Sequence, residues 1–454
     1  MTSKRPERIF GTDGIRALAG EPPLTEDSVR EIGLAAGSVL RSGRRRGKGR
    51  PKVLTGRDTR ASGPWIEKAL CEGLALAGCA PASCGVIPTS GVSALLTMKP
   101  RLGGAVISAS HNPAEFNGIK FFDSEGGKIS ESLEREIESR LSAPPFRPRA
   151  RPPAAAAVPH AGRDYSRFLA GTVPPGFSLK GLRWAVDCAN GSASGVAPAL
   201  LASFGAELEV LHASPDGHNI NSGCGALHPG PLARAVRSSG ADGGCAFDGD
   251  ADRVQFVDDK GNLMDGDVLI AMAAEHLSRS GELAQNSVVT TVMANFGFFK
   301  RMEKLGIRVV TTPVGDRSVS EAMESDGAVL GGEQSGHVIF RKWLPTGDGI
   351  LTALQILSIL TASGKRLSEF TEGFEKFPQI LLNLKVKRKT PVEQCGDLLE
   401  AVRRAESTLA GRGRVLVRYS GTEPLLRVMV EGGSASEIKE IARGIVERAR
   451  GELC

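Results

Sequence analysis

Short apolar runs rich in β-branched residues alternate with longer helical patterns along most of the chain. The runs predict strands at residues 53–55, 106–108, 184–186, 288–291 and 309–311. Helical patterns follow the first and third of these runs, at residues 64–78 and 196–204. Alternation of this kind is typical of α/β domains with largely parallel sheets.

The last stretch of the chain has a different pattern. It predicts strands at residues 380–386, 414–418 and 425–430, and helices at 392–409 and 436–450. Ser434 with Glu437 fits a capping box at the start of the last helix. One face of that helix carries an apolar stripe, made by Ile438, Ile441, Ile445 and Ala449. We expect a small α+β domain whose stripe belongs to the core and carries no chemistry.

Length and local composition predict several domains. The 454 residues exceed the usual size of one domain, and 41% of them are hydrophobic, which is enough for several cores. A proline-rich stretch at 143–159 suits neither a helix nor a central strand and predicts the first boundary. A turn-rich cluster at 258–262 and a weaker signal at 374–378 predict two more.

Charge and cysteine usage exclude several classes of protein. The net charge of +6 fits an anionic substrate or nucleic acid, but the basic run at 44–50 lacks interleaved aromatic residues. The eight cysteines form no C-x-x-C pair, which argues against a zinc cluster and a disulfide scaffold. With no apolar leader and no apolar run of ~18 residues, we expect a cytoplasmic protein without nucleic-acid or membrane partners.

Ser110 and His111 form the first candidate site. They lie in a segment of turn-forming residues, 108–113, directly after the apolar run 105–107. Ligands gather at the carboxyl ends of strands in open α/β sheets, so we expect Ser110 to be exposed there. A serine becomes nucleophilic only when a base takes its proton or its hydroxyl is already phosphorylated. The alternative is an ordinary turn.

Asp248, Asp250 and Asp252 form a more specific motif. They stand at alternate positions with Gly and Ala between them, so they can converge on one hard cation. An EF-hand is excluded, because Arg253 and Asp259 stand where that loop needs Gly and Glu. Magnesium is favoured over calcium, since three carboxylates leave positions for a phosphate oxygen or water. The alternative is an acidic surface turn.

A third segment suits a phosphate dianion. It offers hydroxyls, glycine backbone and two guanidinium groups, on Arg418, Ser420, Gly421, Thr422 and Arg427. Such groups make several charge-assisted hydrogen bonds to phosphate. The alternative is a hairpin turn with surface arginines, and a Walker loop is absent.

Weaker candidates lie elsewhere in the chain. Glu333, Ser335 and His337 stand among glycines and suit vicinal sugar hydroxyls, although an ordinary loop is an equal alternative. Arg16 and Lys120 each stand in a turn-rich segment and, taken alone, are more often solvated than catalytic.

Together, and in this order, these segments resemble the α-D-phosphohexomutase family over essentially the whole chain. Within the family, the segments 10–16, 219–229 and 332–337 are most similar to the branch that acts on amino sugars. Other branches usually carry Met where Gln334 stands. The chain departs from the family at Ala17, Ser318 and Tyr419, and none of these departures removes a catalytic group.

The resemblance implies four domains around a central cleft: three related α/β units with mixed sheets and a smaller α+β unit. We assign residues 1–155 to the domain with the phosphoserine loop and 156–258 to the one with the metal loop. Residues 259–374 would carry the sugar-binding loop and 375–454 the phosphate-binding loop.

The resemblance also implies a role for each candidate residue. Ser110 would be the phosphoserine, and its phosphate would hold Mg²⁺ together with Asp248, Asp250 and Asp252. Lys120 is the first candidate for the acid/base and His111 the second, while Arg16 and Arg253 would steady charge. The sugar would contact Arg253, Glu333, Ser335 and His337. The distal phosphate would contact Arg418, Ser420, Gly421, Thr422 and Arg427.

The implied reaction is reversible transfer of a phosphoryl group that converts glucosamine 6-phosphate into glucosamine 1-phosphate. A hexosamine 1,6-bisphosphate would be both intermediate and primer. The main alternative is a phosphomannomutase or phosphoglucomutase with the same mechanism. A metal-dependent phosphatase and a non-catalytic sugar-phosphate-binding protein are further alternatives, and a homodimer is left open.

Overall fold

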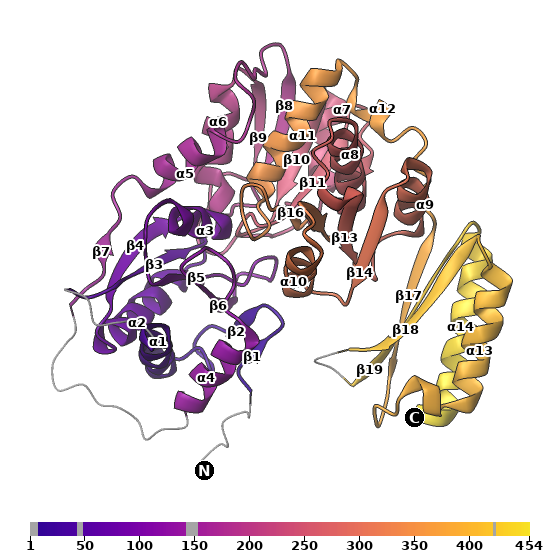
Figure 1. The fold of residues 1–454 in the computed structure, drawn as a ribbon, viewed down its shortest axis with the longest axis horizontal. Coiled ribbons are helices and arrows are strands. Elements are labelled where there is room, and N and C mark those ends of the chain that lie inside the picture. The colour runs from indigo at the N-terminus through magenta and orange to yellow at the C-terminus, as the bar shows by residue number, and fades with distance from the viewer. Residues whose placement is uncertain (1–7, 43–48, 142–152, 421–423) are drawn as a thin grey trace.

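The computed structural model describes residues 8–42, 49–141, 153–420 and 424–454. In this part of the chain the strands form four sheets, which follow one another along the sequence (Figure 1). Most of the basic run at 44–50 and of the proline-rich stretch at 143–159 lies outside the described residues, as do Gly421 and Thr422.

The first sheet has the strand order β1-β2-β6-β5-β3-β4-β7. Its strands are β1 (Phe10–Gly11), β2 (Gly14–Leu18), β3 (Lys52–Arg57), β4 (Ala80–Val86), β5 (Gly103–Ile107), β6 (Phe116–Phe122) and β7 (Ala156–Ala157). Its helices are α1 (Glu26–Arg41), α2 (Gly63–Leu76), α3 (Thr89–Met98) and α4 (Glu131–Leu141). Strands β5, β3, β4 and β7 are parallel, and β6 and β2 continue the sheet antiparallel.

The second sheet repeats this plan in the order β12-β11-β10-β8-β9. Its strands are β8 (Arg183–Asp187), β9 (Glu207–Leu211), β10 (Gly243–Phe247), β11 (Val254–Asp258) and β12 (Leu263–Met264). The helices of this region are α5 (Ala161–Ala170), α6 (Ala197–Ser203) and α7 (Gly230–Ser239). Strands β9, β8 and β10 are parallel, while β11 and β12 are antiparallel.

The third sheet is smaller and has the order β14-β13-β15-β16. Its strands are β13 (Ser287–Thr291), β14 (Arg308–Thr312), β15 (Leu330–Gly332) and β16 (Val338–Phe340). The helices are α8 (Gly266–Arg279), α9 (Phe296–Leu305), α10 (Asp316–Asp326), α11 (Gly349–Ser363) and α12 (Leu367–Phe370). Only β16 among these strands is antiparallel to its neighbour.

The fourth sheet is antiparallel, in the order β17-β19-β18. Its strands are β17 (Gln379–Lys385), β18 (Gly413–Tyr419) and β19 (Leu425–Gly432), and its helices are α13 (Gly396–Leu409) and α14 (Ala435–Leu453). The helices pack beside each other against the sheet (Figure 1). This domain has its own core, whereas one continuous core of buried residues joins the first three sheets.

The predicted fold class is confirmed: three α/β units with mixed sheets precede a smaller α+β unit. The predicted helix 392–409 is wrong at its start, because a short 3₁₀ turn, Val392–Gln394, precedes α13 and extended Cys395 separates the two. Ser434 caps α14 by accepting a hydrogen bond from the Glu437 N–H at 3.4 Å. Strands β7 and β12 lie just past the predicted boundaries at 155 and 258 and pair with the preceding sheets, so the exact domain limits remain predictions.

No helix in the described part of the chain is both long enough and apolar enough to cross a membrane.

Candidate active site

Three of the predicted loops occupy the same topological position. Residues 108–115 join β5 to β6, residues 248–253 join β10 to β11, and residues 333–337 join β15 to β16. Each loop therefore follows the carboxyl end of a parallel strand, where the sheet changes to an antiparallel hairpin. The second and third loops touch, because the Val254 N–H donates to the Gly336 carbonyl at 3.1 Å.

Ser110 lies in a strained and buried turn. Its φ of 51° is in the left-handed region, which non-glycine residues adopt rarely. The expectation that Ser110 is exposed is wrong, because the residue is 0% exposed and the acidic loop of the second domain covers it. A Cβ on Gly249 would lie 2.7 Å from the Ser110 carbonyl oxygen, so only glycine permits this approach.

Arg60 holds the backbone of the Ser110 turn. Its guanidinium donates to the carbonyls of Ser110 at 3.0 Å and Asn112 at 2.8 Å, and also to that of Pro113. Asp58 accepts from Arg60 Nε at 3.0 Å and from Ser108 Oγ at 2.6 Å. Burial raises the pKa of Asp58 above its ordinary value, although the charge of Arg60 opposes the shift.

Sequence reasoning missed Asp58 and Arg60. The signal that could have found them is their position, because both stand in the segment between the predicted strand at 53–55 and the predicted helix at 64–78. It also missed Asn221, whose amide donates to the Ser110 carbonyl at 2.9 Å.

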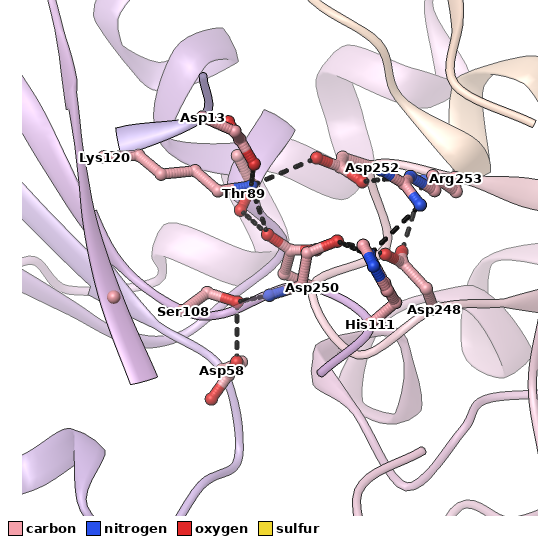
Figure 2. A network of polar contacts seen from close by, with 12 residues as sticks. Asp13, Asp58, Thr89, Ser108, His111, Lys120, Asp248, Asp250, Asp252 and Arg253 are labelled. Atoms are coloured by element: carbon pink, nitrogen blue, oxygen red, sulfur yellow. Dashed lines mark hydrogen bonds and ion pairs between the residues drawn. The ribbon is translucent and has the colours of Figure 1, made fainter. Parts of the chain in front are cut away.

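Asp248, Asp250 and Asp252 converge in one buried cluster (Figure 2). One carboxylate oxygen from each lies within 4.8 Å of the others, and Ser110 Oγ donates to Asp248 Oδ2 at 2.7 Å. Thr89 at the start of α3 donates to Asp250 Oδ2 at 2.6 Å. All three aspartates are buried, which excludes the surface-turn alternative.

The acidic loop fits a divalent cation. The Oδ1 atoms of Asp250 and Asp252 are buried and have no hydrogen-bond partner in the described part of the chain. Burial and the charges of Asp252 and Asp250 hold the pKa of Asp248 well above its ordinary value. Buried carboxylate oxygens without donors are the arrangement that a hard cation stabilises.

Lys120 is embedded in carboxylates. Its Nζ lies 3.0 Å from Asp250 Oδ2, 3.1 Å from Asp13 Oδ2 and 3.3 Å from Asp252 Oδ2 (Figure 2). Burial by itself lowers the pKa of Lys120, but these carboxylates outweigh it and hold the pKa well above its ordinary value. In this arrangement Lys120 is a cation and can give a proton but not accept one.

Unlike Lys120, His111 is held in its neutral form. Arg253 Nη1 donates to its Nδ1 at 3.1 Å, and the same nitrogen lies 3.4 Å from Ser110 Oγ. Burial, followed by the charges of Arg253 and Arg16, lowers the pKa of His111 to about 4. The imidazole is therefore neutral at pH 7, and the Nδ1 that lies beside the serine hydroxyl accepts its hydrogen bond from Arg253.

Arg16 and Lys128 connect this centre to the surrounding elements. Arg16 pairs with Asp13 and donates to Asn112 Oδ1 at 3.3 Å. Lys128, which sequence reasoning missed, pairs with Asp13 and with Asp316 of the third domain.

A cleft of about 870 Å³ opens between the second, third and fourth domains. Arg253, Glu333 and Ser335 line it, and the buried Ser335 hydroxyl has no hydrogen-bond partner among the described residues. The Gln334 amide donates to Asp267 Oδ2 at 3.2 Å and so supports the loop.

His337 has different surroundings from Glu333 and Ser335. It does not line this cleft, and its Nε2 accepts from the Gly347 N–H at 3.1 Å. Its Nδ1 lies 3.7 Å from Asp252 Oδ2. These contacts let His337 position Asp252, and its predicted contact with the sugar stays a prediction.

The predicted phosphate-binding residues lie in the fourth domain, whereas Ser110 lies in the first. Arg418 and Arg427 are direct cross-strand partners on β18 and β19. Burial and then the charge of Arg427 lower the pKa of Arg418 below its ordinary value. Arg427 donates to Ser420 Oγ at 3.4 Å, and Lys389, which sequence reasoning missed, donates to the Ser420 carbonyl at 2.6 Å.

Four family models match the sequence, and together they cover most of it. They are the phosphoglucomutase/phosphomannomutase alpha/beta/alpha domains I, II and III and the C-terminal domain, matched at residues 7–147, 176–261, 265–377 and 381–448.

Curated relatives extend over nearly the whole chain. The phosphoglucosamine mutase of Alkalilimnicola ehrlichii is 45% identical over 98% of this chain and 97% of its own. That of Bacillus subtilis is 44% identical over 98% of this chain and 99% of its own.

Solved structures show the same fold. A phosphoglucomutase/phosphomannomutase family protein from Burkholderia thailandensis matches with a TM-score of 0.80 at 24% identity, covering 99% of this chain and 98% of its own. The N-acetylphosphoglucosamine mutase of Aspergillus fumigatus, solved with GlcNAc-6P and magnesium, matches with a TM-score of 0.70 at 20% identity, covering 99% and 97%.

Proposed function

This chain belongs to the phosphoglucomutase/phosphomannomutase family, and from that premise we propose that it interconverts glucosamine 6-phosphate and glucosamine 1-phosphate through a phosphorylated Ser110. The relatives at 42–45% identity are phosphoglucosamine mutases, so the predicted activity, a phosphosugar mutase, is confirmed at the level of the family. One observation carries the residue assignment: the Ser110 hydroxyl bonds to Asp248 inside a buried ring of acids that also contains a lysine.

Ser110 is the group that gives and recovers the phosphoryl group. Asp248, Asp250 and Asp252 would hold a magnesium ion, which when bound offsets the charge of the serine phosphate. Arg60 and Asn221 donate to the Ser110 carbonyl and fix the turn. The reacting atom, Ser110 Oγ, therefore keeps one position through the reaction. Positioning and charge neutralisation are the main requirements of phosphoryl transfer.

His111 and Lys120 divide the proton transfers between them. Neutral His111 can accept a proton at Nδ1, which lies 3.4 Å from Ser110 Oγ, once Arg253 releases that nitrogen and turns to the substrate. Protonated Lys120 stands among the acids and can supply a proton or a fixed positive charge. This assignment reverses the order expected from the sequence, in which Lys120 was the first candidate for the base.

The sugar and its distal phosphate bind on the other walls of the cleft. Glu333 and Ser335 contact sugar hydroxyls, and Arg253 bridges them to the Ser110 loop. Arg418 and Arg427, with Ser420 and the neighbouring Gly421 and Thr422, hold the phosphate that does not react. A hexosamine 1,6-bisphosphate that turns around between two half-reactions uses both sets of contacts in either orientation.

A labelled bisphosphate tests this proposal. Wild-type protein with Mg²⁺ and ³²P-labelled glucosamine 1,6-bisphosphate should gain label on Ser110 and turn over glucosamine 6-phosphate. Ser110→Ala should lose both the label and the turnover, while Ser130→Ala, which removes an exposed serine, should keep both. Full turnover by Ser110→Ala would contradict the covalent mechanism.

The same assay separates the alternative substrates. Glucosamine, glucose and mannose 1-phosphates are compared side by side with Mg²⁺ and trace bisphosphate. A preference for glucose or mannose would keep the Ser110 assignment but replace the amino sugar. Inorganic phosphate as the sole product would support the phosphatase alternative.

A further inference from the structure

A second group of metal-binding side chains lies in the second domain, outside the acidic loop. Asp187 ends β8, His212 directly follows β9, and Cys224 stands in the loop 219–228. One potential ligand atom from each lies within 4.8 Å of the others. The three residues are far apart in sequence and meet because β8 and β9 are adjacent parallel strands whose carboxyl ends coincide.

The cluster is built into the fold. Asp187 is 0% exposed and Cys224 is 1% exposed, whereas His212 keeps one edge toward solvent. Asp187 Oδ1 accepts from the Ala189 N–H at 2.9 Å, and Oδ2 accepts from the Gly225 N–H at 3.0 Å. These two bonds orient the carboxylate as outer-shell bonds orient metal ligands.

Cys224 is held in place by the glycine that follows it. Gly225 has a φ of 71°, and a Cβ there would lie 2.5 Å from the Phe247 carbonyl oxygen. The Ala226 N–H donates to that same carbonyl at 2.8 Å, which anchors the loop to the end of β10. The Cys224 thiol makes no hydrogen bond within the described part of the chain, although it is buried and lies beside a carboxylate and an imidazole.

The donor set selects a class of ion. Thiolate sulfur, imidazole nitrogen and carboxylate oxygen together suit zinc and its neighbours, while magnesium prefers oxygen alone. His212 Nδ1 and Asp187 Oδ2 share a hydrogen bond at 3.0 Å, and a bound ion would replace its proton, since two ligands of a tetrahedral zinc ion lie roughly 3.3 Å apart. We propose that Asp187, His212 and Cys224 bind one zinc-like divalent ion, with water as the fourth ligand on the exposed side of His212.

This site differs from the zinc cluster that the cysteine spacing excludes, because it uses a single thiol. Burial raises the pKa of Cys224 to about 12, so the residue remains a thiol until a metal displaces its proton to solvent. The bound ion would fix the loop that carries Asn221, whose amide donates to the carbonyls of Ser110 and Asn112. The ion would thus stiffen the support of the Ser110 turn without contacting the reacting atoms.

Cobalt provides a direct probe that does not depend on activity. The chelator-treated full chain, in excess Mg²⁺ to occupy the acidic loop, is titrated with Co²⁺. We expect about one equivalent to bind with a sulfur-to-cobalt charge-transfer absorption, and Zn²⁺ to remove that absorption. Cys224→Ala should abolish the band, while Cys84→Ala, which removes a half-buried thiol from the first sheet, should leave it unchanged.

A second variant keeps the test decisive if Cys224→Ala does not fold. His212→Gln alters the partly exposed ligand and should weaken Zn²⁺ binding by about tenfold or more, measured by competition with a chromophoric chelator. The proposal fails if wild-type protein shows no sulfur-to-cobalt band in Mg²⁺, if the band survives Cys224→Ala, or if His212→Gln binds Zn²⁺ unchanged. None of these outcomes bears on whether Ser110 is phosphorylated.

Discussion

At the scale of single residues, the Ser110 turn depends on one buried guanidinium. Arg60 donates to backbone carbonyls on both sides of His111. Its charge is balanced by Asp58, whose Oδ2 lies 3.0 Å from Arg60 Nε. A planar fork with several fixed donors can serve these acceptors together, whereas a lysine ammonium is a compact point donor. The left-handed backbone of Ser110 is therefore maintained by a buried side chain from another segment of the first domain.

Arg60→Lys tests this support. Lysine can keep the ion pair with Asp58 but cannot hold all of the carbonyls, so Ser110 Oγ should move from its position. We expect kcat to fall by about a hundredfold with little change in KM, because small misplacements of a reacting group have effects of this size. Steady-state kinetics would measure both constants.

The matched control is Arg57→Lys, since Arg57 ends β3, three residues before Arg60, and its Nε lies 3.6 Å from Glu67 Oε2. It should retain nearly all activity. Equal losses in the two variants would show that Arg60 has no special role in holding the turn.

At the scale of elements, α11 begins at an unusual cap. Asp348 accepts from the N–H groups of Ile350 and Leu351, both at 2.9 Å, and from the Tyr165 hydroxyl at 2.7 Å. The carboxyl is completely buried, and burial raises its pKa to about 6 despite these hydrogen bonds. Helix α11, which packs against elements of the second and third domains, therefore starts at an acid whose ionised form is disfavoured by burial.

This cap predicts a pH dependence of stability. The unfolded chain ionises near the ordinary pKa of 3.8 and the folded chain near 6, so the folded state binds more protons between these values. The contribution of Asp348 is complete below pH 4 and is lost as pH rises through 6, by about 3 kcal/mol. Asp348→Asn keeps the capping oxygen and removes this loss.

Urea unfolding at pH 4.5 and 7.5 measures the effect. The free energy of unfolding of Asp348→Asn relative to wild type should rise between the two values. An unchanged difference would contradict a raised pKa at this position.

The elements show which parts of the structure a sequence predicts. Some of the strands, among them β13, β14, β17 and β19, and helix α14 were predicted because apolar periodicity is local, and the Asp248 loop because its three acids are close together in the chain. The burial of Ser110 was not predicted, since it depends on a loop 138 residues away. The roles of Arg60 and Asn221 were missed because both side chains bind backbone carbonyls of a turn that is distant in the sequence. No sequence motif displays backbone acceptors.

At the scale of the whole molecule, the proposed chemistry is divided between distant domains. Ser110 belongs to the first domain and the paired arginines, Arg418 and Arg427, to the fourth, which lies apart from it (Figure 1). The junction between the third and fourth domains therefore sets the distance between the reacting and the distal phosphate. Glu431 on β19 is the centre of that junction and is 0% exposed.

Glu431 joins the domains through both carboxylate oxygens. Oε1 accepts from Asn295 Nδ2 at 3.1 Å and from the Phe296 N–H at 3.4 Å, both at the start of α9. Oε2 accepts from Arg414 Nε at 2.5 Å, and Arg414 also donates to the Ala294 carbonyl. A buried carboxylate with this set of donors fixes one orientation of the fourth domain.

Glu431→Gln should loosen that orientation while it preserves the shape of the side chain. The amide cannot accept at both ends, so either Arg414 or the α9 backbone loses its acceptor at a cost of about 1–3 kcal/mol. We expect a broader particle in small-angle X-ray scattering and a KM for the sugar phosphate raised about tenfold, since closing the cleft must now overcome that loss. Glu437→Gln, on the outer helix α14, should change neither quantity. If Glu431→Gln matched wild type in both measurements, the distance between the two phosphate sites would be set by some contact other than this junction.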